Sequence, residues 1–293
     1  MAIVPRRSAL YMPGANTRAL EKAKTLPADC LILDLEDSVA PDAKATARDQ
    51  IKAAVANGGF PGREVVIRVN GVGTSWLGDD LAMAATASPD AVLVPKVSNH
   101  GDVDAIRAAM AEAGVAGGVP VWAMIETAEA ILKLPELVAA SPSDRHAVTC
   151  FVVGANDLVK ETRMQLDASR SQAQYWLAAI VTAARAGGID VLDSVYNDFR
   201  DIDGFKAECD AGRDLGMDGK TLIHPGQIEI ANETFQPGDD AVADARAILD
   251  AFSRPENKGL GVINMEGRMV ERLHAEMAER TVAIADAIAS KSS

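Results

Sequence analysis

Short apolar runs recur along the first three quarters of the chain, and a stretch of helical length separates each run from the next. The runs are rich in Val, Ile and Leu, as buried parallel strands are. Eight are present, at residues 8–12, 30–36, 65–70, 91–96, 119–126, 149–157, 189–194 and 220–224. Strands that alternate with helical stretches predict repeated βα units. Eight such units predict an α/β protein whose fold is a (β/α)8 barrel.

The charged and polar residues of these runs fall mostly at their carboxyl ends. The residues in question are Glu36, Asp37, Arg68, Asn70, Lys96, Glu126, Asp157, Asp193 and His224. In a (β/α)8 barrel the carboxyl ends of all strands meet on one face, and that face holds the active site. The pattern therefore predicts one pocket lined by acidic and basic side chains from separate parts of the chain.

The last quarter of the chain has a different pattern. The segment FQPGDD at 235–240 contains Pro and Gly and predicts a boundary. We therefore expect a barrel over 1–235 and an extension over 236–293. Within the extension, apolar periodicity predicts helices over 239–254 and 270–289, with a hairpin-like segment at 255–269 between them. So small a segment is not expected to hold a core alone. We expect it to pack on the barrel, to pack on a neighbouring subunit, or to act as a lid.

Composition narrows the class of protein. The chain has 293 residues, of which 48% are hydrophobic and 24% are charged, and these values are typical of a globular protein. Its net charge of −13 argues against nucleic acid as the main partner. No signal peptide is evident, and no apolar run reaches the roughly 18 residues that a membrane span needs. We therefore expect a cytoplasmic protein that does not enter the membrane.

Glu126 and Asp157 are the best candidates for metal ligands. They end neighbouring runs, so they should be neighbours on the barrel rim. Mg²⁺ prefers oxygen ligands and usually takes one or two protein carboxylates, with water and substrate completing its shell. The alternative is a pair of solvated loop acids or a structural ion pair.

Arg68 stands inside an apolar run, where a charged group is costly unless it is paired or faces a ligand. Its planar fork suits a substrate carboxylate or an enolate oxygen. The alternative is an ion pair inside the barrel. Glu36 and Asp37 follow the second run and are expected to hold the waters of a metal or to orient the cationic residue. Alternatively, they complement the dipole of the following helix.

Four basic residues lie near the expected rim and are candidates for binding phosphate groups: Lys22, Lys44, Arg48 and Lys96. The alternative for each is a solvated helix face. His224 precedes Pro225 and Gly226, which mark a tight loop, and we expect it to shape the pocket. Dinucleotide-binding glycine motifs and Walker loops are absent from the sequence.

Several motifs, taken in order, resemble one known family. They are RRSALYMPGANTRALEKAKTLPADCLILDLEDSVAPDAKATAR, IRVNGVGT, VPKVS, MIETAEAI, GANDL and LIHPGQI. Together they are similar to the citrate lyase β-subunit-like branch of the HpcH/HpaI aldolase family, and the similarity spans nearly the whole chain. The resemblance implies a TIM barrel that binds Mg²⁺ and a CoA thioester.

The resemblance also implies a reaction. Its first implication is cleavage or formation of the C–C bond of a 3-hydroxyacyl-CoA such as (S)-malyl-CoA or citramalyl-CoA, which gives acetyl-CoA and glyoxylate or pyruvate. One alternative is hydrolysis of the (3S)-malyl-CoA thioester on the same scaffold. Another is a metal-dependent aldolase for free 2-oxo acids.

Site residues follow from the resemblance by position. Glu126 and Asp157 match the metal ligands, and Arg68 matches an arginine that binds substrate and stabilises an enolate oxygen. Tyr11 and Lys22 fall where family members contact CoA. Asn156 and Pro225 belong to matching motifs and are expected beside the substrate or CoA.

The C-terminal motif NMEGRMVERLH resembles the lid of the family, in which an aspartate commonly enters a neighbouring subunit's site. Glu271 stands at that position in this chain. It is expected to protonate the enolate in a lyase, or to activate water or attack the thioester in a hydrolase. The resemblance implies a homotrimer or hexamer.

Overall fold

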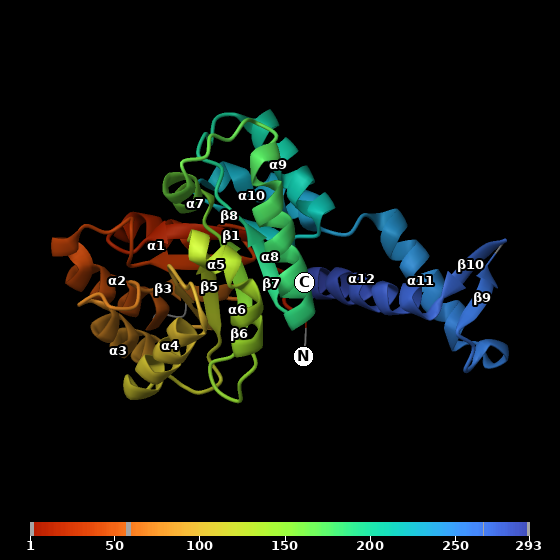
Figure 1. The fold of residues 1–293 in the computed structure, drawn as a ribbon, viewed down its shortest axis with the longest axis horizontal. Coiled ribbons are helices and arrows are strands. Elements are labelled where there is room, and N and C mark those ends of the chain that lie inside the picture. Colours follow the sequence, from red (N-terminus) through yellow and green to blue (C-terminus); the bar gives the residue numbers. More distant parts are fainter. Residues whose placement is uncertain (1–2, 57–59, 266, 292–293) are drawn as a thin grey trace. The chain divides into compact units, whose positions relative to one another are not determined.

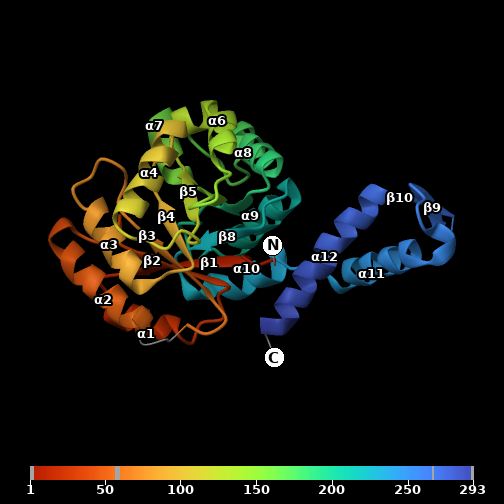
Figure 2. The ribbon, with the colours of Figure 1, turned by 90° about the horizontal axis from the view of Figure 1, so that it is seen from below.

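Two units make up the chain in the computed structural model, which describes residues 3–56, 60–265 and 267–291. One unit is Arg6–Thr234, and the other combines Met1–Pro5 with Phe235–Ser293. Figure 1 shows the strands of the first unit enclosed by helices, and Figure 2 shows the same unit from below.

The first unit is a closed barrel of eight parallel strands in sequence order. The barrel closes where β1 pairs with β8. The strands are β1 (Ser8–Pro13), β2 (Cys30–Asp34), β3 (Glu64–Arg68), β4 (Ala91–Val94), β5 (Val121–Ile125), β6 (Val148–Val153), β7 (Asp190–Asp193) and β8 (Gly219–Leu222). The predicted (β/α)8 TIM barrel is confirmed.

Helices connect successive strands and cover the barrel. They are α1 (Thr17–Ala23), α2 (Lys44–Ala56), α3 (Leu77–Ala87), α4 (His100–Glu112), α5 (Ala128–Leu132), α6 (Leu134–Ala140), α7 (Ala155–Thr162), α8 (Gln174–Gly187), α9 (Ile202–Leu215) and α10 (Ile228–Phe235). Single 3-10 turns occur at η1 (Pro41–Ala43), η2 (Ser171–Ala173) and η3 (Pro225–Gln227).

The barrel interior is filled by alternate residues of the strands, since side chains along a strand point in turn to opposite faces. Ile32, Leu93, Trp122 and Val152 belong to this fully buried cluster. Arg6, which precedes β1, lies over the Trp122 ring at 4.9 Å and pairs with Glu64 at 2.7 Å. The interior is therefore a packed core, and space for a ligand is left at the carboxyl ends.

The strands end earlier than the apolar runs suggested. β2 ends at Asp34, β4 at Val94 and β5 at Ile125, so Glu36, Lys96 and Glu126 lie in the loops that follow. The predicted run 149–157 contains both a strand and a helix start. β6 ends at Val153, and Asp157 lies in the first turn of α7.

Asp193 was predicted to line the pocket, and the structure corrects this. Leu192 points into the barrel core, so Asp193 points to the helix layer instead. There it accepts hydrogen bonds from Arg170 at 2.8 Å and from Lys220 at 2.8 Å, and Lys220 also pairs with Glu208 at 2.6 Å. Asp193 therefore belongs to a buried ion-pair cluster that ties the strands to α9.

The second unit is a helix, a hairpin and a helix. Its elements are α11 (Asp239–Ser253), η4 (Pro255–Asn257), β9 (Val262–Met265), β10 (Arg268–Glu271) and α12 (Arg272–Lys291). Ile248 and Phe252 of α11 pack with Ile263 and Val270 of the hairpin in a small apolar cluster. Both predicted helices are present. Across the described residues, no helix is long and apolar enough to cross a membrane.

Candidate active site

A cavity of about 400 Å³ opens at the carboxyl ends of the barrel strands. Seven of the eight strands or their following loops contribute to its lining. The lining includes Tyr11, Asp34, Asp37, Arg68, Met124, Glu126, Asn156, Asp157, Asn197, Thr221 and Ile223. The predicted site residues Tyr11, Asp37, Arg68, Glu126, Asn156 and Asp157 are thus brought together around one space.

Arg68 is the buried cation of this cavity. Its Nε and one terminal nitrogen donate to the two carboxylate oxygens of Asp34, at 2.6 and 2.7 Å. Burial alone would lower the pKa of Arg68, but its contacts with Asp34 outweigh burial and raise it. The guanidinium lies over the Tyr11 ring at 4.7 Å. A guanidinium held on two sides in this way presents its remaining nitrogen in a fixed direction.

That remaining nitrogen faces Glu36. Arg68 Nη1 lies 2.9 Å from Glu36 Oε2 and 3.8 Å from the Met124 sulfur. The other Glu36 oxygen accepts from the Lys96 ammonium at 3.1 Å. Burial raises the pKa of Glu36, and the charge of Asp37 adds to the shift. Glu36 therefore contacts both cationic side chains, Arg68 and Lys96.

Glu126 and Asp157 form an acidic corner of the cavity. Glu126 is 3% exposed, and its Oε1 accepts from the main-chain amide of Lys96 at 2.8 Å. Burial, followed by the nearby charge of Asp157, raises the pKa of Glu126 to about 7. A buried carboxylate whose charge is disfavoured by a neighbouring carboxylate is a group that a cation stabilises.

This corner fits a hard divalent cation. Gly154 precedes α7, and a Cβ built there would lie 2.4 Å from Glu126 Cβ and 2.6 Å from Oε2. The missing side chain thus makes room for the carboxylate beside Asp157. Among the described residues, no group of three or more His, Cys, Asp and Glu side chains has metal-ligand geometry. A cation at this corner would take two protein carboxylates, as Mg²⁺ commonly does.

Asn156 and Asn197 mark the mouth of the cavity. Their side-chain amides exchange hydrogen bonds of 2.9 and 3.3 Å, which links the loop after β6 to the loop after β7. Asp37 is exposed, and it lines both this cavity and a neighbouring one. His224 caps η3, accepts from the Gly226 amide at 3.1 Å and stacks on Phe199. It is not itself among the lining residues of the cavity, whereas the preceding residue, Ile223, is.

Two predicted contacts lie outside the lining of the cavity. Lys22 is exposed on α1, and Pro225 is half-buried at the start of η3, two residues beyond the lining residue Ile223. Asn16 accepts from the Ala19 amide and caps α1.

Glu271 belongs to the second unit, where its main-chain amide donates to His274 Nδ1 at 2.9 Å.

The basic residues Lys44 and Arg48 were expected to be available for phosphate, and the structure assigns them structural contacts instead. Lys44 is buried, and its ammonium donates to the carbonyls of Leu35 and Glu36 at 2.7 and 2.8 Å. Arg48 pairs with Asp80 at 2.9 Å, and Asp80 is fully buried. Lys44 therefore fixes the loop that carries Glu36.

The sequence analysis missed three contributors to the site. They are Asp34, the main-chain amide of Lys96, and Asn197. The signal for Asp34 was present in DLED, where an acid stands inside the second apolar run. The other two depend on loop conformation, for which the sequence carried no comparable signal.

Comparison with known proteins identifies the family. The model of HpcH/HpaI aldolase/citrate lyase matches residues 7–225. The chain belongs to this family. A (3S)-malyl-CoA thioesterase of Cereibacter sphaeroides is 45% identical over 98% of this chain and 96% of its own length. An L-malyl-CoA/beta-methylmalyl-CoA lyase of the same species is 35% identical over 98% of this chain and 96% of its own.

A solved structure agrees with the sequence relatives. Protein CitE from Mycobacterium tuberculosis, in complex with magnesium, acetoacetate and coenzyme A, matches with a TM-score of 0.71 and 27% identity. The match covers 96% of this chain and 98% of the CitE chain. The chain is therefore an enzyme of the HpcH/HpaI family built on the family's barrel.

Proposed function

We propose that the protein is a Mg²⁺-dependent thioesterase that hydrolyses (3S)-malyl-CoA. The observation that carries the proposal is the cavity that buried Arg68 lines together with Glu126 and Asp157 of the acidic corner. Such a pair of opposite charges suits a substrate with a carboxylate, a hydroxyl and a thioester carbonyl. The 45% identity to a malyl-CoA thioesterase, against 35% to a malyl-CoA lyase, favours hydrolysis over C–C cleavage.

Glu126 and Asp157 would hold the Mg²⁺ ion. When bound, the ion supplies a Lewis acid that orients the substrate carboxylate and 3-hydroxyl. Glu126 keeps one oxygen on the Lys96 amide, so its direction is fixed before the ion arrives. Asp157 lies in the first turn of α7.

Arg68 would act at the thioester carbonyl. Asp34 holds two of its nitrogens, so the guanidinium does not reorganise when negative charge develops on the carbonyl oxygen. Glu36 lies beside the third nitrogen and keeps the cation paired until substrate binds. Burial of this group strengthens its interaction with a developing oxyanion, because water does not screen it.

Hydrolysis requires that a carboxylate accept the proton of the attacking water. The water oxygen bonds to the thioester carbon while the base takes one of the water protons. The C–S bond then breaks and the base passes that proton to the CoA sulfur; the second proton leaves the new carboxyl group, which gives malate and free CoA. We propose Glu271 as this base, by its position in the lid-like motif. Asp37 is the alternative, because it lines the cavity and is exposed.

The remaining predicted contacts belong to the CoA portion of the substrate. We propose that Tyr11 and Asn156 contact the part of CoA next to the acyl group of the substrate, since both residues line the cavity. Pro225 at the rim and exposed Lys22 on α1 would contact the pantetheine and phosphate groups.

The extension 236–293 is proposed to serve as a lid and as an oligomer contact in a homotrimer or hexamer. Its hairpin and last helix expose Val262, Met269 and Met277 by 48%, 66% and 65%. Apolar side chains grouped in this way mark an interaction surface. Light scattering of the purified protein measures the oligomeric state.

C–C cleavage of malyl-CoA is the second candidate, and the 35% identical lyase supports it. Both reactions use the same acidic corner and the same arginine. They differ in the bond that breaks, so one assay separates them.

The assay supplies purified protein with Mg²⁺ and (3S)-malyl-CoA, and follows free thiol, malate, acetyl-CoA and glyoxylate together. We expect free thiol and malate in equal amounts, without glyoxylate. Glyoxylate with acetyl-CoA would overturn the thioesterase proposal in favour of the lyase. Absence of all four products would overturn both. The Glu126→Gln variant is the control, because its turnover should be lost at every Mg²⁺ concentration.

A further inference from the structure

Lys96 has an unusual main-chain conformation for its residue type. Its φ is +56°, in the left-handed region, and it lies two residues after the end of β4, at the carboxyl end of the barrel. A side chain with a Cβ is disfavoured there, because the Cβ crowds the carbonyl oxygen. Such conformations persist where the surrounding structure requires them.

The conformation directs the Lys96 amide at the acidic corner. The amide donates to Glu126 Oε1 at 2.8 Å, and Glu126 is almost fully buried. A buried carboxylate needs fixed donors to keep one orientation. The main chain of Lys96 supplies such a donor without adding a side chain to the cavity.

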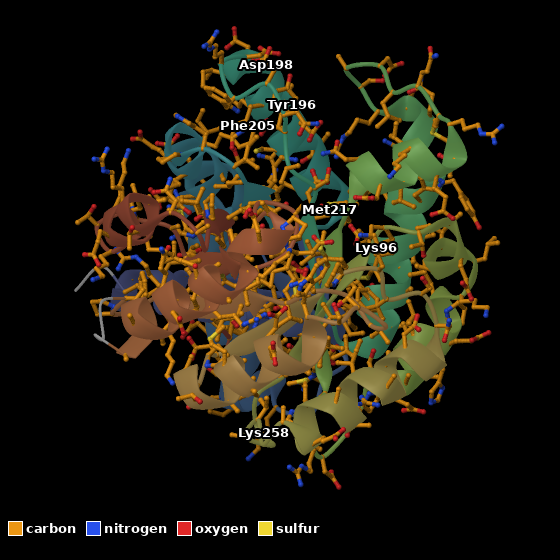
Figure 3. All side chains as sticks on the ribbon, turned by 90° about the vertical axis from the view of Figure 1, so that its left-hand side faces the viewer. Lys96, Tyr196, Asp198, Phe205, Met217 and Lys258 are labelled. Atoms are coloured by element: carbon orange, nitrogen blue, oxygen red, sulfur yellow. The ribbon has the colours of Figure 1, made fainter. Side chains whose placement is uncertain are left out.

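The side chain of Lys96 makes a separate contact. Its ammonium donates to Glu36 Oε1 at 3.1 Å, and the other oxygen of Glu36 lies 2.9 Å from Arg68. The side chain is 52% exposed, and it lines a second cavity of about 490 Å³ together with Glu36 and Asp37. Figure 3 labels Lys96 among the side chains of the barrel unit. Burial alone would lower the pKa of the Lys96 ammonium, but the charges of Glu36, Glu126 and Asp157 raise it. Lys96 therefore stands between the carboxylate that faces Arg68 and the two that form the corner.

We propose that Lys96 is a positioning residue with two separable parts. Its main-chain amide fixes Glu126 at the acidic corner, and its ammonium holds Glu36 in the orientation that faces Arg68. The second part rests on the proposed thioesterase function for its kinetic test. The first part is measured without substrate.

The first experiment measures the main-chain part by equilibrium unfolding in urea. Lys96→Gly and Lys96→Ala are compared, first with Glu126 intact and then together with Glu126→Ala. With Glu126 intact we expect the glycine variant to be more stable, by roughly five- to thirtyfold in the unfolding equilibrium constant. Once the carboxylate is removed, the main chain is free to relax, and the difference should fall within about twofold.

Ser88 is the matched control, because its main chain is also in the left-handed region, with φ +52°. It caps the carboxyl end of α3. Ser88→Gly against Ser88→Ala should give the same difference whether or not Glu126 is present. An unchanged glycine advantage at position 96 after removal of Glu126 would overturn the main-chain part.

The second experiment measures the ammonium part with Lys96→Met and Lys96→Arg. Lys96→Met keeps the amide, so calorimetric Mg²⁺ affinity should not weaken by more than about threefold. Its kcat for malyl-CoA should fall about tenfold at a nearly unchanged KM, because Glu36 is free to turn from Arg68. Lys96→Arg keeps the positive charge and should restore most of kcat.

Two results would overturn the ammonium part. A Lys96→Met variant with wild-type kcat would overturn it, as would an equal loss in Lys96→Arg. If the wild-type protein does not hydrolyse malyl-CoA, the proposed function fails, and the urea and calorimetric measurements still decide the role of the amide.

Discussion

Arg68 and Asp34 stand directly opposite each other on β3 and β2 and share two hydrogen bonds of 2.6 and 2.7 Å. The register of β2 with β3 places them side by side. Burial would raise the pKa of Asp34, but the hydrogen bonds and charge of Arg68 outweigh burial and lower it. The carboxylate is thus kept charged as the permanent partner of the arginine.

Removal of the Asp34 charge should destabilise the fold. In Asp34→Asn, Arg68 remains buried without its full partner, and loss of one member of a buried pair typically costs about 3–5 kcal/mol. We expect a decrease of that order in the free energy of unfolding, measured in urea. Asp37→Asn is the control, because that side chain is exposed and should change stability by less than about 0.5 kcal/mol. Equal stability of the two variants would contradict the argument.

Substitution of Arg68 by lysine should affect catalysis more than folding. A lysine keeps the positive charge but lacks the planar fork that contacts Asp34 twice. We expect kcat for malyl-CoA to fall by about 10²–10³, the loss typical of one oxyanion donor. Steady-state kinetics with circular dichroism of the same samples makes the measurement. A kcat within threefold of wild type would remove Arg68 from the reaction.

A methyl group at Gly154 should disturb the acidic corner. The added Cβ in Gly154→Ala would fall 2.6 Å from Glu126 Oε2, so the carboxylate must move. We expect Mg²⁺ affinity, measured by calorimetry, to weaken by roughly 10- to 100-fold, the range found when the support of a metal ligand is lost. Gly78→Ala is the control, because a Cβ in that helix meets open space. Wild-type affinity in Gly154→Ala would mean that Glu126 does not bind the ion.

The Asp193 cluster should make stability depend on pH in the acid range. Burial would raise the pKa of Asp193, but Lys220 and Arg170 outweigh burial and lower it from 3.8 to about 2. The unfolded chain therefore takes up the proton before the folded protein does. The stabilisation should be complete above pH 4 and lost as pH falls from about 4 to 2.

Urea unfolding of wild type and Asp193→Asn at pH 7, 4 and 3 measures this dependence. We expect the variant to be less stable by about 3–5 kcal/mol at pH 7, because two buried cations lose a partner. The gap should narrow from pH 4 to pH 3. A gap that is constant across the three pH values would contradict the lowered pKa.

The barrel was predictable from the sequence because its strands are separate apolar runs and their order along the chain is their order in the sheet. Arg68, Glu126 and Asp157 could be placed near one cavity for the same reason, since each follows its own strand. These predictions need only local pattern and the rule that strand ends converge.

The direction in which a side chain points was harder to predict than the strand end at which it lies. In β7 all but the first residue are buried, so polar–apolar alternation did not reveal that Asp193 points to the helix layer. Asp34 ends a strand that is buried on both faces, so the pattern did not distinguish it from the core. The prediction named Glu36 and Asp37 instead. The partners of Arg48 and Lys96 lie 32 and 60 residues away, and no local pattern encodes such pairs.

The division of the chain into two units has a bearing on how reactions diverge in this family. The arginine, its carboxylate partners and the acidic corner all belong to Arg6–Thr234, whereas Glu271 belongs to the other unit. On the proposed mechanism, substrate recognition and proton transfer are then encoded in separable segments of the gene. Exchange of residues 235–293 between relatives would then alter the fate of the bound thioester while the binding chemistry stays intact.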